Sequence, residues 1–246
     1  MSTIKFIFLI FCFFFFNSCA VGSQSARFPR ESFVKIHTKM TVEFCTESSE
    51  NLSVCEKSDF YSVGSGAVVW HKNKKTFILT AGHVCHAEVE SPLKELTTSV
   101  TMKFKVQNIH NKWYDVTVSN ISPEYLNGNE LDLCILQSDG IISMPKIHLS
   151  LTSPKIGEQL YNVAAPTGFF SPPTVPLLSG YYSGPLGKYH SLLTIPATGG
   201  SSGSPVLNHR GELVGLIFAA YEGFPHLTIS VRYEVLRKYL QENLYP

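Results

Sequence analysis

The chain has little charge of either sign. Of its 246 residues only 16% are charged, and 20 basic against 19 acidic residues leave a formal net charge of +1. Neither sign forms a long run, so strong electrostatic attraction to nucleic acid or anionic lipid is not indicated. Sequence repeats and low-complexity segments are lacking too. With 44% hydrophobic and 12% aromatic residues, the composition predicts a folded globular protein that binds no nucleic acid.

Long apolar runs are absent apart from one near the start, residues 6–16. At about eleven residues this run is too short to cross a bilayer as a helix, but it has the length of a signal-peptide core. Ser18 and Ala20 are the small residues that a signal peptidase prefers. We therefore expect residues 1–20 to be a signal peptide, the mature chain to lack a membrane span, and the protein to be secreted or periplasmic. The alternative is cleavage before Cys19, which leaves a lipid-anchored cysteine.

Cysteines are few. The chain has six, and removal of the signal peptide leaves four, an even number in an oxidising compartment. Cys45 and Cys55 flank a polar stretch typical of a hairpin loop and can pair across it, which stabilises the fold by roughly 2–4 kcal/mol if the bridge is unstrained. Cys85 with Cys134 is the pairing left over, and two buried free thiols are the alternative.

Helical spacing is nearly absent. Residues 233–244 alone carry apolar side chains on one face of a helix. Short strands with turn signals between them predict an all-β sandwich or barrel. The expected strands are residues 33–44, 64–70, 75–80, 99–106, 113–118, 131–137, 159–164, 191–195, 205–207, 212–218 and 226–231. Residues 143–154, with two prolines and no clear period, are the best candidate for a linker between two halves.

Three segments offer the parts of a nucleophilic site. The sequence TAGH places His83 just past an apolar strand, DLCIL places Asp132 at the head of an apolar run, and GGSSGSP supplies serines among glycines. A serine hydroxyl needs a base to remove its proton, a group that holds that base in one tautomer, and N–H donors for the oxyanion. A buried carboxylate is costly without a partner, and a glycine-rich turn can direct consecutive N–H groups at one point.

These three segments, in this order, resemble the chymotrypsin-fold (trypsin-like) serine peptidases. The likeness extends to residues 64–69 before the histidine and 211–215 after the serine, and it is nearest to the HtrA-like and viral trypsin-like members. The resemblance implies two six-stranded antiparallel β-barrels packed together with a C-terminal α-helix, the first in residues 21–145 and the second in residues 146–246. No PDZ domain is expected after that helix.

The resemblance also implies roles for individual residues. The family motif Gly-x-Ser-Gly-Gly-Pro aligns Ser202 as the nucleophile, His83 as the general base and then acid, and Asp132 as the residue that orients His83. The backbone N–H groups of Gly200 and Ser202 form the oxyanion hole. Glu130 is the second choice for the acid.

Two departures from the motif carry information. Ser201 stands where the digestive enzymes have an aspartate that pairs with a new N-terminus after zymogen cleavage, so we expect no such activation switch. Ser204 replaces a glycine and adds a Cβ beside the turn.

The position of the substrate-specificity pocket is inferred by aligning the sequence with the family. The family's primary pocket then has Pro196 near its base and Phe218, Ala219 and Ala220 along its wall. Since no acidic residue falls there, we expect cleavage after small or medium apolar residues rather than after Arg or Lys.

Two other classes of protein are considered. Gly199 to Gly203 also fits the nucleophile elbow of an α/β-hydrolase with Ser201 as nucleophile, but that fold needs Asp and His after the serine. The second class is a catalytically silent peptide-binding protein on the same fold. The remaining histidines lack zinc-motif spacing, so we expect no metal, and acyl transfer by a triad requires no cofactor. The expected partner is a polypeptide substrate.

Overall fold

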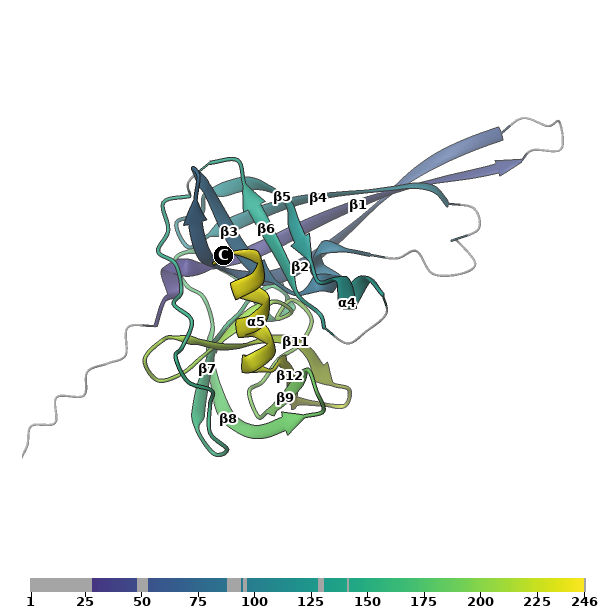
Figure 1. The fold of residues 1–246 in the computed structure, drawn as a ribbon. Coiled ribbons are helices and arrows are strands. Elements are labelled where there is room, and N and C mark those ends of the chain that lie inside the picture. Colours follow the sequence, from purple (N-terminus) through teal and green to yellow (C-terminus); the bar gives the residue numbers. More distant parts are fainter. Residues whose placement is uncertain are drawn as a thin grey trace, which may run out of the picture.

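The computed structural model describes residues 28–47, 53–87, 94, 97–127, 131–140 and 142–245. The predicted signal peptide, residues 1–20 with Cys19, lies outside the described residues, as does Glu130. Figure 1 shows two β-barrels, one above the other, with a single long helix beside them.

Both barrels are closed and antiparallel, with six strands each. The first has the strand order β1-β2-β3-β6-β5-β4 and is built from β1 (Phe33–Glu47), β2 (Ser53–Lys72), β3 (Lys75–Thr80), β4 (Thr97–Asn108), β5 (Trp113–Ile121) and β6 (Cys134–Ser138). The second has the order β10-β11-β12-β9-β8-β7 and is built from β7 (Gln159–Val163), β8 (Leu177–Leu186), β9 (His190–Leu193), β10 (Ser204–Leu207), β11 (Leu213–Tyr221) and β12 (Phe224–Val231). The predicted fold class is therefore confirmed.

Among the described residues, short helical turns precede or connect the strands. They are η1 (Arg30–Ser32), α2 (Gly82–Cys85), α4 (Pro123–Leu126) and η2 (Pro166–Gly168), and the long C-terminal helix is α5 (Tyr233–Asn243). The expected linker, residues 143–154, lies between β6 of the first barrel and β7 of the second.

The sequence analysis missed strand β8. Its sequence LLSGYYSGPL contains two glycines and a proline, which interrupt the pattern of a strand. The structure shows why glycine is needed at both positions. A Cβ at Gly180 would collide with the backbone of Thr194, and Gly184 has a φ of +137° at an irregularity in the pairing with β9.

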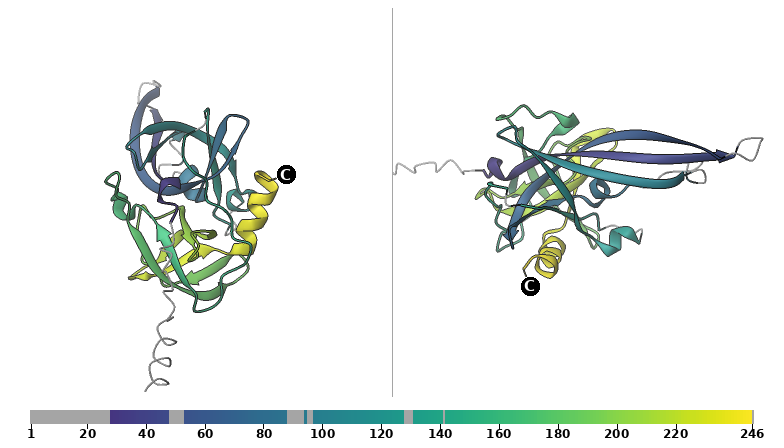
Figure 2. Two further views of the ribbon diagram at one scale, coloured as in Figure 1. Left: turned by 90° about the vertical axis from the view of Figure 1, so that its left-hand side faces the viewer. Right: turned by 90° about the horizontal axis from the view of Figure 1, so that it is seen from above.

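Strands β1 and β2 extend far beyond the first barrel as a long arm (Figures 1 and 2). The analysis predicted β2 only from residue 64, whereas the strand begins at Ser53. Its outer half stays exposed and mixes charged residues with the exposed hydrophobic side chains of Val54, Phe60 and Tyr61. Lys39 of β1 forms a 2.8 Å ion pair with Asp59 of β2. Cys45 pairs with Cys55 across the arm, and the two form a disulfide bond. Charged side chains along an open strand edge are a common protection against pairing with other chains.

The C-terminal helix joins the two barrels. Leu236 and Leu240 are fully buried in the larger hydrophobic cluster, and Tyr239 Oη donates a 2.8 Å hydrogen bond to Asn120 Oδ1 of β5. Burial raises the pKa of the Tyr239 hydroxyl. Figure 2 shows the helix lying along the side of both barrels. No helix in the described part of the chain is long and apolar enough to cross a membrane.

Candidate active site

His83 lies on α2, a single helical turn that directly follows strand β3. Its Nδ1–H donates to Asp132 Oδ2 at 2.6 Å, and its backbone N–H donates to Asp132 Oδ1 at 2.8 Å. The Asp132 side chain is 10% exposed, whereas that of His83 is 39% exposed. Because a carboxylate accepts, the proton of the neutral imidazole is held on Nδ1, and Nε2 is left as the acceptor.

Gly82, next to His83, is a site residue that the sequence analysis did not single out. A Cβ at this position would lie 2.8 Å from Asp132 Oδ1 and 3.0 Å from the ring of Tyr125. A glycine is needed here because the backbone of α2 must approach the carboxylate closely. The glycine in the TAGH segment was the sequence feature that could have pointed to this close approach.

The three serines of GSSGSP have different surroundings. Ser201 is 1% exposed, its Oγ accepts a 3.3 Å hydrogen bond from the Thr198 N–H, and its own N–H donates to the Thr198 carbonyl oxygen. Ser204 is fully buried and its Oγ accepts from Asn162 Nδ2 at 2.8 Å. Ser202 is only partly buried, and it lines the cavity of the site together with Ser201. Burial of Ser201 in the loop speaks against the hydrolase elbow, which needs an exposed nucleophile.

The loop around Ser202 depends on two glycines in the left-handed region. Gly200 has a φ of +89° and Gly203 a φ of +84°. A Cβ at Gly200 would lie 2.5 Å from the carbonyl oxygen of Ala165, and one at Gly203 would collide with the Ser65 carbonyl oxygen. Both positions therefore require glycine for conformation and for space.

Ser65 of β2 ties this loop to the first barrel, a contact that the sequence analysis missed. Its backbone N–H donates to the Ser202 carbonyl oxygen at 2.8 Å, and its Oγ donates to the Gly200 carbonyl oxygen at 2.7 Å. The same Oγ accepts the N–H of Ala165 at 3.0 Å. One buried hydroxyl thus connects three segments. In the sequence, the distinctive GSGAVV segment that contains Ser65 was the available hint of this contact.

The N–H groups of Gly200 and Ser202 are the predicted oxyanion donors. Within the described ranges, neither group donates to a protein acceptor. The hydroxyl of Ser202 donates to the carbonyl oxygen of Phe218 at 3.5 Å, and no bond between this hydroxyl and the His83 ring occurs in the described part of the chain. A 3.5 Å contact is long for an O–H donor, and such bonds often tighten only when substrate is bound.

A cavity of about 370 Å³ opens beside Ser202. Its walls include the predicted Phe218, Ala219 and Ala220, but Pro196 is not among the residues that line it. The full lining is Ala197, Thr198, Gly199, Ser201, Ser202, Ile217, Phe218, Ala219, Ala220, Tyr221, Glu222, Gly223 and Pro225. The positional comparison with the family predicted no acidic residue in this pocket. In the structure, the turn between β11 and β12 places Glu222 in its wall. Glu222 is exposed, so its charge lies at the rim.

A second hollow, of about 580 Å³, lies next to Asp132. Phe218 lines both hollows, and its ring centroid is 4.9 Å from that of His190. The lining residues are Tyr125, Asp132, Leu186, Gly187, His190, Phe218 and Ile229. The sequence analysis did not predict this space because its walls come from five separate segments. No cluster of His, Cys, Asp and Glu suited to a metal ion occurs among the described residues.

Two closed barrels with a histidine–aspartate pair and a glycine-rich serine loop between them define the class of chymotrypsin-like proteins. The model of the trypsin-like peptidase domain family matches residues 64–216. The chain belongs to this family of serine peptidases, and the predicted resemblance is confirmed.

Solved structures show the same fold. A serine endoprotease from Yersinia pestis matches with a TM-score of 0.60 and 16% sequence identity, over 90% of this chain and 66% of that chain. The active form of the Rv3671c protease from M. tuberculosis matches with a TM-score of 0.61 and 14% identity, over 88% of this chain and 82% of that chain. The present chain thus spans just under two thirds of the first of these proteins. No curated protein matches it in sequence.

Proposed function

We propose that this protein is an exported serine endopeptidase that hydrolyses peptide bonds through the triad His83, Asp132 and Ser202. The observation that carries the proposal is the pair of bonds from His83 to Asp132, at 2.6 and 2.8 Å. They hold the imidazole as the Nδ1–H tautomer, which is the form that a general base of this class needs.

The mechanism follows from these positions. Ser202 Oγ attacks the carbonyl carbon of the substrate while His83 Nε2 takes its proton. The oxyanion that forms is stabilised by the N–H groups of Gly200 and Ser202, both without a protein acceptor in the described residues. His83 then gives the proton to the leaving amine as the C–N bond breaks. Water repeats the sequence on the acyl-enzyme, releases the acid and restores Ser202.

The substrate is a polypeptide bound in an extended form. A chain entering along the end of β11 can pair with its backbone and place one side chain in the cavity beside Ser202. Phe218, Ala219 and Ala220 line that cavity together with Ile217 and glycines. We therefore propose cleavage after small or medium apolar residues.

Export remains a proposal that rests on residues 1–20. The two disulfide bonds are compatible with an oxidising compartment. Secretion leaves a mature chain that begins at Val21, whereas a lipoprotein begins at an acylated Cys19. The mass of the N-terminal peptide of the mature protein distinguishes the two.

The test is labelling with a fluorophosphonate, which reacts with an activated serine. We expect the adduct on Ser202 by peptide mass spectrometry, its loss in His83→Ala, and its retention in Ser62→Ala, which removes an exposed hydroxyl on the arm. No adduct on folded protein would favour the silent peptide-binding protein. An adduct on Ser201 would show that the motif has been aligned wrongly.

A further inference from the structure

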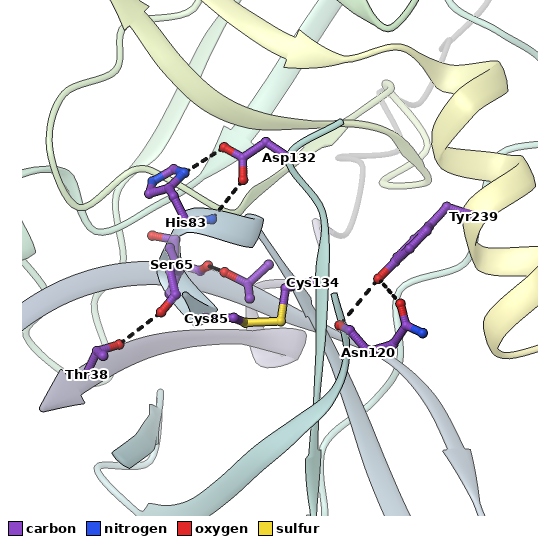
Figure 3. The surroundings of a disulfide bond; sticks show 10 residues. Thr38, Ser65, His83, Cys85, Asn120, Asp132, Cys134 and Tyr239 are labelled. Atoms are coloured by element: carbon purple, nitrogen blue, oxygen red, sulfur yellow. Dashed lines mark hydrogen bonds and ion pairs between the residues drawn. A yellow bond between two sulfur atoms is a disulfide. The ribbon is translucent and has the colours of Figure 1, made fainter. Parts of the chain in front are cut away.

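The Cys85–Cys134 disulfide bond lies next to the catalytic pair on both sides. Cys85 follows His83 by two residues on α2, and Cys134 follows Asp132 by two residues at the start of β6. The two sulfurs are bonded and the two Cα atoms are 6.4 Å apart. Figure 3 shows the bridge and the His83–Asp132 contact as two neighbouring links between the same pair of segments.

These two links close a small ring. It runs through residues 83–85, across the disulfide bond, back through residues 132–134, and across the hydrogen bonds from Asp132 to His83. A movement of α2 along β6 that separates the imidazole from the carboxylate would have to distort six residues of backbone. The bridge therefore restricts the very displacement that would break the catalytic contact.

Besides the bridge, α2 is held by the burial of Val84 in the main hydrophobic cluster and by one long hydrogen bond to β1. It is a single turn of four residues, and so short a helix has no stability of its own. Thr38 Oγ1 donates to the Val84 carbonyl oxygen at 3.3 Å, which is a long bond. The cysteines, by contrast, are 3% and 0% exposed and belong to the main hydrophobic cluster.

We propose that the Cys85–Cys134 disulfide is a positioning element for the triad, which holds His83 in hydrogen-bond contact with Asp132. This inference rests on the proposed function. It assigns the bridge an effect on turnover in addition to its effect on stability, because a misplacement of about 1 Å at a catalytic group can cost about 100-fold in rate.

The second disulfide bond supplies a matched control. Cys45 and Cys55 lie on the arm, where strand pairing already places them opposite each other. The variants to compare are therefore Cys85→Ala/Cys134→Ala and Cys45→Ala/Cys55→Ala, each measured at a temperature at which circular dichroism shows it folded. We expect the first to lower kcat by roughly 10- to 100-fold with KM within about twofold, and the second to leave both near wild type. Equal values for the two variants, or a loss confined to KM, would overturn the proposal.

A double-mutant cycle separates positioning from general stabilisation. In an Asp132→Asn enzyme the His83–Asp132 contact is already impaired. Adding Cys85→Ala and Cys134→Ala to that enzyme should therefore lower its kcat by less than about threefold. A purely structural bridge would cost the same factor in both backgrounds.

The wild-type protein provides a measurement that needs no cysteine variant. The proton on His83 Nδ1 should give a downfield NMR signal while it is bound to Asp132. Dithiothreitol opens the bridges by thiol–disulfide exchange, and the signal should weaken as Cys85 and Cys134 become thiols. A signal that persists with this bridge open would overturn the proposal. Absence of fluorophosphonate labelling in the oxidised wild type would instead contradict the proposed function itself.

Discussion

The hydroxyl of Ser65 donates a 2.7 Å hydrogen bond to the carbonyl oxygen of Gly200, from a strand of one barrel to the loop of the other that carries the proposed nucleophile Ser202. It is one half of a paired contact, because the Ser65 N–H also donates to the Ser202 carbonyl oxygen. The loop that presents Ser202 is thus fixed from outside its own barrel.

Substitution Ser65→Ala tests this contact. It leaves the partly buried Gly200 carbonyl oxygen and the buried Ala165 N–H without a partner, which should lower the free energy of unfolding by about 1–3 kcal/mol. We also expect kcat/KM to fall by at least about tenfold, because one of the proposed oxyanion donors belongs to Gly200. Urea unfolding and peptide hydrolysis measure the two effects. Ser62→Ala on the exposed arm is the control, and equal behaviour of the two variants would refute the role of Ser65.

Gly82→Ala tests the close approach of α2 to Asp132. The added Cβ meets Asp132 Oδ1 at 2.8 Å and must push the carboxylate or the helical turn aside. We expect a loss in kcat of about 100-fold, since the His83–Asp132 geometry is disturbed directly. A Cβ at Gly140 meets nothing within 4 Å, so Gly140→Ala should keep wild-type kinetics. A fully active Gly82→Ala enzyme would contradict the geometry.

Glu222 should exclude acidic side chains from the cavity beside Ser202. Its carboxylate lies in the cavity wall at an exposed turn, so repulsion of about 1 kcal/mol, or roughly fivefold in kcat/KM, is reasonable for an exposed pair. Peptides with Asp before the scissile bond should be cleaved more slowly than matched Asn peptides. Glu222→Gln and high salt should both reduce the difference. An Asp/Asn ratio that Glu222→Gln leaves unchanged would rule Glu222 out.

The stability of the first barrel should depend on the pH through His37. Burial lowers the pKa of His37 below its ordinary value of 6.5, and the charge of Lys35 lowers it further. Below 6.5 the unfolded chain therefore takes up a proton that the folded chain does not, and the free energy of unfolding falls as the pH falls. The contribution is complete above 6.5 and is lost progressively on acidification toward the folded pKa.

His37→Phe is the variant that checks this dependence. It keeps a ring against Trp113, which packs on His37 at 4.6 Å between centroids, and it cannot titrate. Urea unfolding at about pH 7.5 and about pH 5 should show a smaller decrease for His37→Phe than for wild type. The same decrease in both proteins would exclude His37 as a contributor.

Much of the architecture was predictable from local sequence. Eleven of the twelve strands stand out, at least in part, as short apolar segments with turn signals between them, because alternation and β-branched residues are properties of neighbouring positions. Strand β8 was not predicted because glycine at position 180 is required by the backbone of Thr194, just after β9, and not by the neighbouring residues of the sequence. The outer half of β2 escaped because an exposed arm has no buried face to impose a hydrophobic pattern.

The sequence by itself determined the order of the chemical groups: TAGH, then DLCIL, then GSSGSP, and with them the family. Tertiary structure decided which groups meet. It buried Ser201 and Ser204 and left Ser202 in the cleft, brought Ser65 across from the first barrel, and placed Glu222 rather than Pro196 in the wall of the cavity. The physical reason is that hydrogen bonding, burial and pocket shape depend on separate segments of the chain, such as Ser65 and Gly200, which are 135 residues apart, and no local pattern encodes such contacts.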